Sequence, residues 1–151
     1  MVIVAHLVTI YKASHRLKAV GEAYDKRKDL FMKEQARMVQ VAYNALDEKK
    51  GEDIKIIDIS GISVIADYFV IANGNNISQV QALVDNVEEK MLKAGFEVKR
   101  IEGNKSSTWV LMDFGDVVIH VFDSEDRLFY DLERIWTDGK IVDVETLGTY
   151  V

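Results

Sequence analysis

The feature that most constrains the fold of this 151-residue chain is an unbroken apolar run, Tyr68–Ala72. Successive side chains of a strand point to opposite faces, so this run predicts a strand buried on both faces. A helix follows, which Asn76 or Ser78 can cap and Gly95 ends. Its apolar stripe consists of Val80, Leu83, Val84, Val87, Met91 and Leu92. A doubly buried strand before an amphipathic helix predicts a parallel crossover around residues 77–95.

The remaining segments also alternate between strand and helix patterns. Strands are expected at 54–59, 96–101, 109–113 and 117–122, and the short link Phe114-Gly115-Asp116 predicts a hairpin between the last two. Ser124 is expected to cap a final helix that runs to Trp136. The order predicts one α/β (α+β) domain, with a mixed sheet of about five strands and helices on at least one face.

Charge and pattern divide the chain at Met32. Residues 1–31 hold six Lys/Arg and three Asp/Glu, whereas residues 32–151 hold thirteen and twenty-two. A clean helical pattern begins at Met32 and ends near Gly51. We therefore expect an N-terminal extension over residues 1–31, either a loose segment with a mis-assigned start or a real accessory helix. The domain proper is expected over 32–138, followed by a loose tail over 139–151.

Composition excludes several classes of protein. The chain has no cysteine, which excludes a disulfide framework, a thiol nucleophile and a thiolate zinc site. The apolar opening lacks the basic start and cleavage site of a secretory signal, and no run is long enough to span a bilayer. The acidity of residues 32–151 argues against binding to a nucleic-acid backbone. It suits a basic protein partner or serves only solubility, and we expect a cytoplasmic protein without membrane contact.

Catalytic patterns are missing where they would be expected. His120 is the only histidine after residue 15, so no pair has metal-ligand spacing. No serine lies in a Gly-x-Ser-x-Gly turn, and no Asp-x-Asp pair exists to gather two metal ions. Asp113 and Asp116 lie on either side of a turn and need not converge. We therefore expect neither enzymatic activity nor a cofactor, with a nucleotide-binding or nucleotidyltransferase enzyme as the weaker alternative.

The residue types that remain are those of a protein interface, where Trp, Tyr and Arg are the usual anchors. The candidate protein-binding residues are Trp109, His120 and Phe122 on strands, Glu102 in a loop, Arg127 and Tyr130 on the last helix, and Asp67 and Tyr68 at the buried strand. Four of them have a structural alternative. Trp109 and His120 can be core residues, Asp67 can cap a turn, and Arg127 with Asp131 can form an i, i+4 pair on a solvated helix face.

Six motifs, in order, resemble the ribosomal silencing factor family, also called Iojap-like, and the resemblance covers roughly residues 32–138. They are Asp58-Ile59-Ser60-Gly61-Ile62-Ser63, residues 66–74, Glu102-Gly103, residues 109–113, residues 115–122 and Arg127-x-x-Tyr130-x-Leu132-Glu133-x-x-Trp136. Each motif is modest alone, whereas six at the expected spacing are specific.

The resemblance implies a nucleotidyltransferase-like fold without catalytic carboxylates. It also implies a partner, universal large-subunit protein fourteen, where a bound domain would block joining of the small ribosomal subunit and lower translation when nutrients are short. Related proteins act in mitochondria and chloroplasts in ribosome assembly or silencing. An assembly role therefore stays an open alternative. Whether the free protein forms a homodimer through the same patch is a separate open question.

Overall fold

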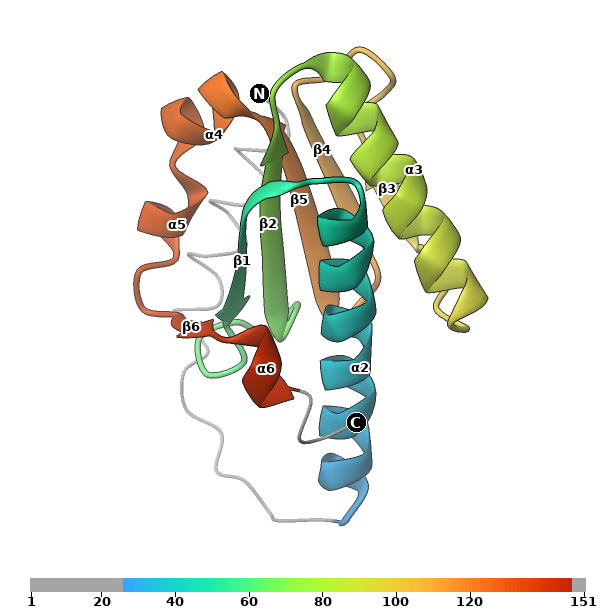
Figure 1. Cartoon of the computed structure of the whole chain (residues 1–151). Coiled ribbons are helices and arrows are strands. Elements are labelled where there is room, and N and C mark those ends of the chain that lie inside the picture. Colours follow the sequence, from blue (N-terminus) through green and yellow to red (C-terminus); the bar gives the residue numbers. More distant parts are fainter. Residues whose placement is uncertain (1–25, 148–151) are drawn as a thin grey trace.

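The computed structural model describes residues 26–147, which form one mixed sheet with helices on both sides (Figure 1). The sheet has six strands in the order β3-β4-β5-β2-β1-β6. The strands are β1 (Glu52–Asp58), β2 (Tyr68–Gly74), β3 (Arg100–Glu102), β4 (Trp109–Asp113), β5 (Val117–Asp123) and β6 (Lys140–Val142). The predicted class is therefore confirmed, with one strand more than expected.

The apolar run of β2 lies at the centre of the sheet, between β1 and β5. It pairs parallel to β5, from Tyr68 opposite Val117 to Gly74 opposite Asp123, and antiparallel to β1. The connection from β2 to its parallel partner contains α3 (Ile77–Lys93) and the strands β3 and β4. The helix predicted after β2 is thus part of a longer crossover that returns the chain to the sheet centre.

Two long helices cover one face of the sheet, α2 (Lys26–Glu48) and α3 (Figure 1). Asn76 caps α3 by accepting a hydrogen bond from the backbone N–H of Gln79, and Gly95 follows with φ +92. The apolar faces of both helices meet the sheet in a first core, whose fully buried members include Val39, Leu46, Val70, Leu83 and Ile119.

The opposite face of the sheet carries a second core. Its members come from alternate positions of the same strands, because strand side chains alternate between faces. The short helices α4 (Ser124–Tyr130) and α5 (Leu132–Ile135) lie on this side. Buried residues of the second core include Ile57, Phe69, Trp109, Phe122, Leu132 and Trp136.

The single helix predicted from Ser124 to Trp136 is wrong, because the chain breaks it at Asp131. Asp131 adopts a left-handed conformation, with φ 44 and ψ 57, and separates α4 from α5. The break redirects the chain so that Leu132 and Trp136 both reach the second core. The helix cap was also misplaced: Asp123 accepts from the N–H groups of Glu125 and Asp126, both at 3.0 Å, whereas Ser124 donates to the Gly74 carbonyl.

The tail beyond residue 138 was expected to be loose, and this expectation is wrong for residues 140–147. β6 pairs antiparallel to β1, with Ile141 opposite Ile57, and becomes the edge strand of the sheet. The helix α6 (Val144–Leu147) follows and places Leu147 in the first core. The strand expected over 96–101 is also shifted, since Phe96 packs into the first core and β3 covers only Arg100–Glu102.

The predicted boundary at Met32 falls inside a helix, since α2 includes residues 26–31. Leu30 and Met32 are exposed, and Ala36 is the first buried side chain in the stretch from residue 32 onward. The expected extension over residues 1–25 lies outside the described residues. The division at Met32 therefore stays a prediction.

Candidate protein-binding site

Four of the candidate residues come together on the second-core side of the sheet. Trp109 and Phe122 lie opposite each other on β4 and β5, with stacked rings 4.6 Å apart. Tyr130 of α4 contacts the Trp109 ring at 4.9 Å, and His120 lies at 6.0 Å. The sequence motifs that named these residues therefore describe one aromatic cluster, made of Trp109, His120, Phe122 and Tyr130.

This aromatic cluster is mostly interior. Of the two interpretations of Trp109, the structure shows the core residue, because only 6% of Trp109 is exposed, and His120 and Phe122 are fully buried. Stacking against β5 and α4 covers the ring, although Trp109 opens its strand after a polar loop. Only Tyr130 is partly exposed. Trp109 is therefore part of the core.

His120 is held neutral by its surroundings. The indole N–H of Trp109 donates to Nδ1 of His120 at 3.2 Å, which assigns the proton of the neutral ring to Nε2. No described residue accepts a hydrogen bond from Nε2. Burial lowers the pKa of His120 from 6.5 to about 3, because the charged form would lose its hydration. A general acid–base role near neutral pH is not available to this side chain.

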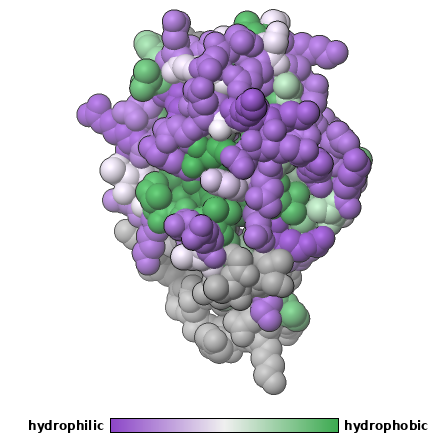
Figure 2. Space-filling view, in the orientation of Figure 1, coloured by the Kyte–Doolittle hydropathy of each residue, from purple (hydrophilic) through white to green (hydrophobic). Residues whose placement is uncertain are grey.

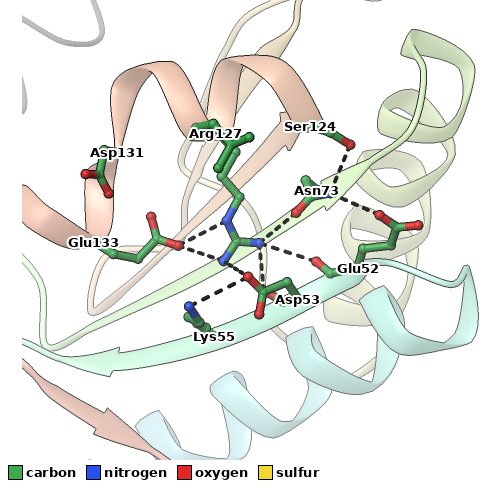
Figure 3. Close-up of a pocket in the computed structure, with 9 residues that line it drawn as sticks. Glu52, Asp53, Lys55, Asn73, Ser124, Arg127, Asp131 and Glu133 are labelled. Carbon is green, nitrogen blue, oxygen red and sulfur yellow. Dashed lines mark hydrogen bonds and ion pairs between the residues drawn. The ribbon is translucent and has the colours of Figure 1, made fainter.

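Arg127 is buried too, and its guanidinium joins three parts of the chain (Figure 3). Its Nη1 donates to the carbonyl oxygens of Asp53 at 2.7 Å and Glu52 at 3.4 Å, and to Oδ1 of Asn73 at 2.8 Å. Its Nε and Nη2 both donate to one carboxylate oxygen of Glu133, at 3.0 and 2.7 Å. Arg127 thereby ties α4 to β1, to β2 and to α5.

The expected i, i+4 pair of Arg127 with Asp131 on a solvated face is wrong. Arg127 points inward and pairs with Glu133 and with the carboxylate of Asp53, 3.3 Å away. Asp131 points away from the guanidinium (Figure 3), because its left-handed backbone turns it out of the helical position. Asp53 also has a positive φ, of 46°, at the irregular register of β1. The Arg127 network therefore bridges two unusual backbone conformations.

The most exposed apolar side chains of this region are Leu128 and Phe129, at 82% and 80% exposure. Both lie on α4, between the buried Arg127 and the partly buried Tyr130. Apolar atoms stand out over α4 at the upper left of Figure 2, within a mostly hydrophilic face. The sequence motif Arg127-x-x-Tyr130 leaves these two positions unspecified, so neither residue was named as a candidate. A pair of adjacent large apolar residues in a short helix was the available signal, but their exposure depends on how α4 packs.

Two pockets flank α4. The larger, about 440 Å³, lies on the side of β1 and β2 and includes Arg127, Leu128 and Glu133 in its lining. The smaller, about 260 Å³, lies beside the loop before β4 and is lined by residues that include Trp109 and Tyr130. Thr108 donates a hydrogen bond to Asp126 in its wall. The helix thus forms a ridge with an apolar crest, Leu128 and Phe129, between two hollows; we call this the α4 ridge.

Three sequence candidates lie away from the ridge. Asp67 and Tyr68 are at the opposite end of β2, since Tyr68 pairs with Val117 whereas Trp109 pairs with Phe122. Five strand residues, roughly 17 Å, separate the two ends. Tyr68 packs against the first core, on the other face of the sheet. Glu102 lies on the edge strand β3 and pairs with Arg100 at 3.1 Å.

Asp67 has an electrostatic feature of its own. Burial raises the pKa of its carboxyl, and the negative charges of Asp116 and Asp58 raise it further. A hydrogen bond that Gln35 donates to the carboxylate at 2.5 Å acts in the opposite direction. The balance raises the pKa, so the folded protein favours the protonated form of Asp67 more than the unfolded chain does.

The described part of the chain contains no candidate metal centre. No three His, Asp or Glu side chains of residues 26–147 gather where a metal ion could be held. Among the same residues, no helix is long and apolar enough to cross a membrane. The features that stand out are an exposed apolar helix crest, two flanking hollows and a network that fixes their position. Together they define a mixed α/β domain with a surface suited to binding another protein.

The family follows from comparison with known proteins. The model of the family "Ribosomal silencing factor during starvation" matches residues 32–150. The ribosomal silencing factor RsfS of Halalkalibacterium halodurans is 44% identical over 108 residues, which cover 72% of this chain and 92% of that protein. RsfS of Bacillus subtilis is 41% identical over 111 residues, covering 74% and 94%. This chain belongs to the ribosomal silencing factor family.

Structural and more distant relatives agree with this assignment. A crystal structure from Bacillus halodurans superposes with a TM-score of 0.64 at 40% identity, covering 71% of this chain and 97% of that one. A mouse protein named "Mitochondrial assembly of ribosomal large subunit protein 1" is 31% identical over 102 residues, covering 66% of this chain and 45% of that protein. The fold expected from the sequence is thus found in relatives.

Proposed function

We propose that this protein is a cytoplasmic ribosomal silencing factor, which binds the large ribosomal subunit at universal large-subunit protein fourteen and blocks association with the small subunit. The observation that carries the proposal is family membership across almost the whole described domain. The α4 ridge supplies a surface that such binding requires, because exposed large apolar side chains beside hollows are typical of protein-binding sites.

The proposed mechanism is steric and involves no chemical step. A standard interface of about 800 Å² on each partner is sufficient for a stable complex. The protein then competes with the small subunit, so the fraction of silenced subunits depends on relative concentration and affinity. The acidity of residues 32–151 favours encounter with a basic ribosomal protein, because complementary charge speeds association.

The test is a sucrose gradient of purified large and small subunits, with and without this protein. We expect it to sediment with the large subunit and to reduce the fraction of joined ribosomes. Binding to the large subunit without any effect on joining would contradict silencing. Failure to bind would contradict the proposal altogether.

The second candidate is an assembly factor for the large subunit. It is favoured by the printed name of the mouse relative, which refers to assembly of that subunit. A strain that lacks this protein distinguishes the two functions. Accumulation of immature large subunits supports assembly, whereas mature subunits that join more readily during starvation support silencing.

A further inference from the structure

We propose that the larger pocket beside α4 receives a lysine or arginine side chain of the protein partner, while an aliphatic part of the partner covers Leu128. This inference rests on the proposed function and specifies the chemistry of recognition at the same surface. It assigns partner binding to the rim of the Arg127 network rather than to Arg127 itself.

The pocket combines a sizeable volume, an apolar residue in its lining and an excess of negative charge. Its volume is about 440 Å³, and Leu128, 82% exposed, stands at its margin. Four carboxylates and two cations line it, which leaves a net charge of −2. The carboxylates belong to Glu52, Asp53, Asp131 and Glu133, and the cations to Lys55 and Arg127.

The two cations of the pocket do not neutralise all four carboxylates. Arg127 already forms ion pairs with Glu133 and Asp53, and Lys55 lies 3.6 Å from the Asp53 carboxylate. Within residues 26–147, the side chain of Asp131 makes no hydrogen bond or ion pair, and it points away from Arg127 (Figure 3). One oxygen of Glu133 holds the guanidinium, and the second accepts no hydrogen bond from any described residue. The excess negative charge is therefore carried by Asp131 and by the second carboxylate oxygen of Glu133.

A cationic side chain fits this arrangement better than an anionic or a purely apolar one. Lysine and arginine carry a long aliphatic stem below the charged group, so the stem can lie along Leu128 while the charge meets the carboxylates. The crest residue Phe129 extends the apolar contact beyond the pocket. The partner that fits is a protein segment with a basic residue and aliphatic neighbours. The basic residue then pairs with the carboxylates of the pocket, and the aliphatic neighbours cover the exposed apolar residues of α4.

Asp53 and Asp131 offer a precise test, because both have positive φ and asparagine tolerates this conformation well. Asp53→Asn with Asp131→Asn removes two negative charges with almost no change in shape. Because Asp53→Asn also removes one ion pair of Arg127, Asp131→Asn alone is measured beside the pair and should weaken binding in the same direction. The matched control is Glu88→Gln with Glu97→Gln, which makes the same change in net charge at exposed positions in and just after α3. Binding to purified large subunits is measured at low and high salt, and a melting curve checks each fold.

We expect the asparagine pair to weaken binding at low salt by about fivefold or more and to reduce its salt dependence, as loss of a rim charge does. The glutamine pair should bind like the wild type. Equal binding by the asparagine pair, or equal loss in both pairs, would overturn the pocket inference and leave the proposed function standing. Failure of the wild type to bind large subunits would overturn both.

The apolar contact at Leu128 is tested with a second substitution and its matched control. Leu128→Ala should weaken large-subunit binding by about tenfold, as a contact near an interface centre does. Leu92→Ala removes an equivalent leucine, 60% exposed, on α3. It should leave binding unchanged. Equal effects of the two substitutions would show that α4 is not the docking surface.

Discussion

Trp109 and His120 share a buried hydrogen bond, in which the indole N–H donates to Nδ1 at 3.2 Å. The pair joins neighbouring strands β4 and β5 within the second core. It explains why two residues of the family motifs occur together although neither is exposed. Both residues contribute packing to the face of the sheet against which α4, with its exposed crest, lies.

Trp109→Ala is therefore expected to lower the free energy of unfolding by roughly 3–5 kcal/mol, because it leaves a large cavity beneath Tyr130. Trp109→Phe keeps most of the volume and should cost less, through the lost hydrogen bond to His120. Urea denaturation measures both. A well-folded alanine variant that loses only ribosome binding would instead identify Trp109 as a docking anchor.

Stability should fall when the medium becomes mildly acidic, because of His120. Its folded pKa, about 3, lies below the usual 6.5, so the unfolded chain binds the proton more readily between these values. The stabilisation is present above pH 6.5 and is lost as pH falls towards 3, by about 1.4 kcal/mol for each pH unit. The measurement is the unfolding free energy at pH 7 and pH 5. His120→Gln cannot titrate and can still accept from Trp109, so its pH dependence should be smaller by about 2 kcal/mol over this range.

Arg127→Met should destabilise the domain by about 3 kcal/mol or more, because it leaves Glu133, the Asp53 carbonyl and the buried Asn73 side chain without their donor. Glu133→Met added to Arg127→Met removes the orphaned carboxylate and should recover part of the loss. The wild type, Arg127→Met, Glu133→Met and the double variant form a double-mutant cycle, which chemical denaturation can measure. Additive effects would show that the Arg127–Glu133 pair is not coupled.

Asp67→Asn is expected to raise stability at neutral pH. Burial and the neighbouring Asp116 and Asp58 raise the pKa of this carboxyl, so its charged form is less stable in the folded protein. Wild-type stability from this group is therefore greatest below the usual value of 3.8 and decreases as pH rises through the folded pKa. Asparagine can still accept the hydrogen bond from Gln35. The gain should be visible at pH 7 and absent near pH 3, and no such gain is expected for the exposed Asp47→Asn.

A chain that starts at Met32 should fold and bind large subunits as the longer chain does. Within residues 32–48, the buried side chains of α2 begin at Ala36, and both Leu30 and Met32 are exposed. Loss of the first turns should then change the unfolding free energy by no more than about 1 kcal/mol. A marked loss of binding by a stable truncated protein would show that residues 1–31 contribute to docking.

The sequence alone determined the central elements. The apolar run at Tyr68 predicted a doubly buried strand, and Gly115 marked the hairpin between β4 and β5, where it adopts φ +92. The start of α3 was predicted at Asn76 or Ser78, and the structure shows Asn76 as the cap. These features are readable because their causes are local: side-chain alternation, a capping oxygen and a backbone conformation that favours glycine. The family could likewise be predicted from the order and spacing of short motifs, because neither depends on knowing which residues are in contact.

Only the tertiary structure decided which candidate residues are exposed. Arg127 lies next to Leu128 in the sequence, yet one is buried and the other is 82% exposed. The difference arises because Arg127 is held by Glu52, Asp53 and Asn73, which are at least 54 residues away along the chain. The pairing of β6 with β1 depends on the same kind of long-range contact. Local pattern reports what a segment prefers, whereas burial is set by partners that only folding brings into contact.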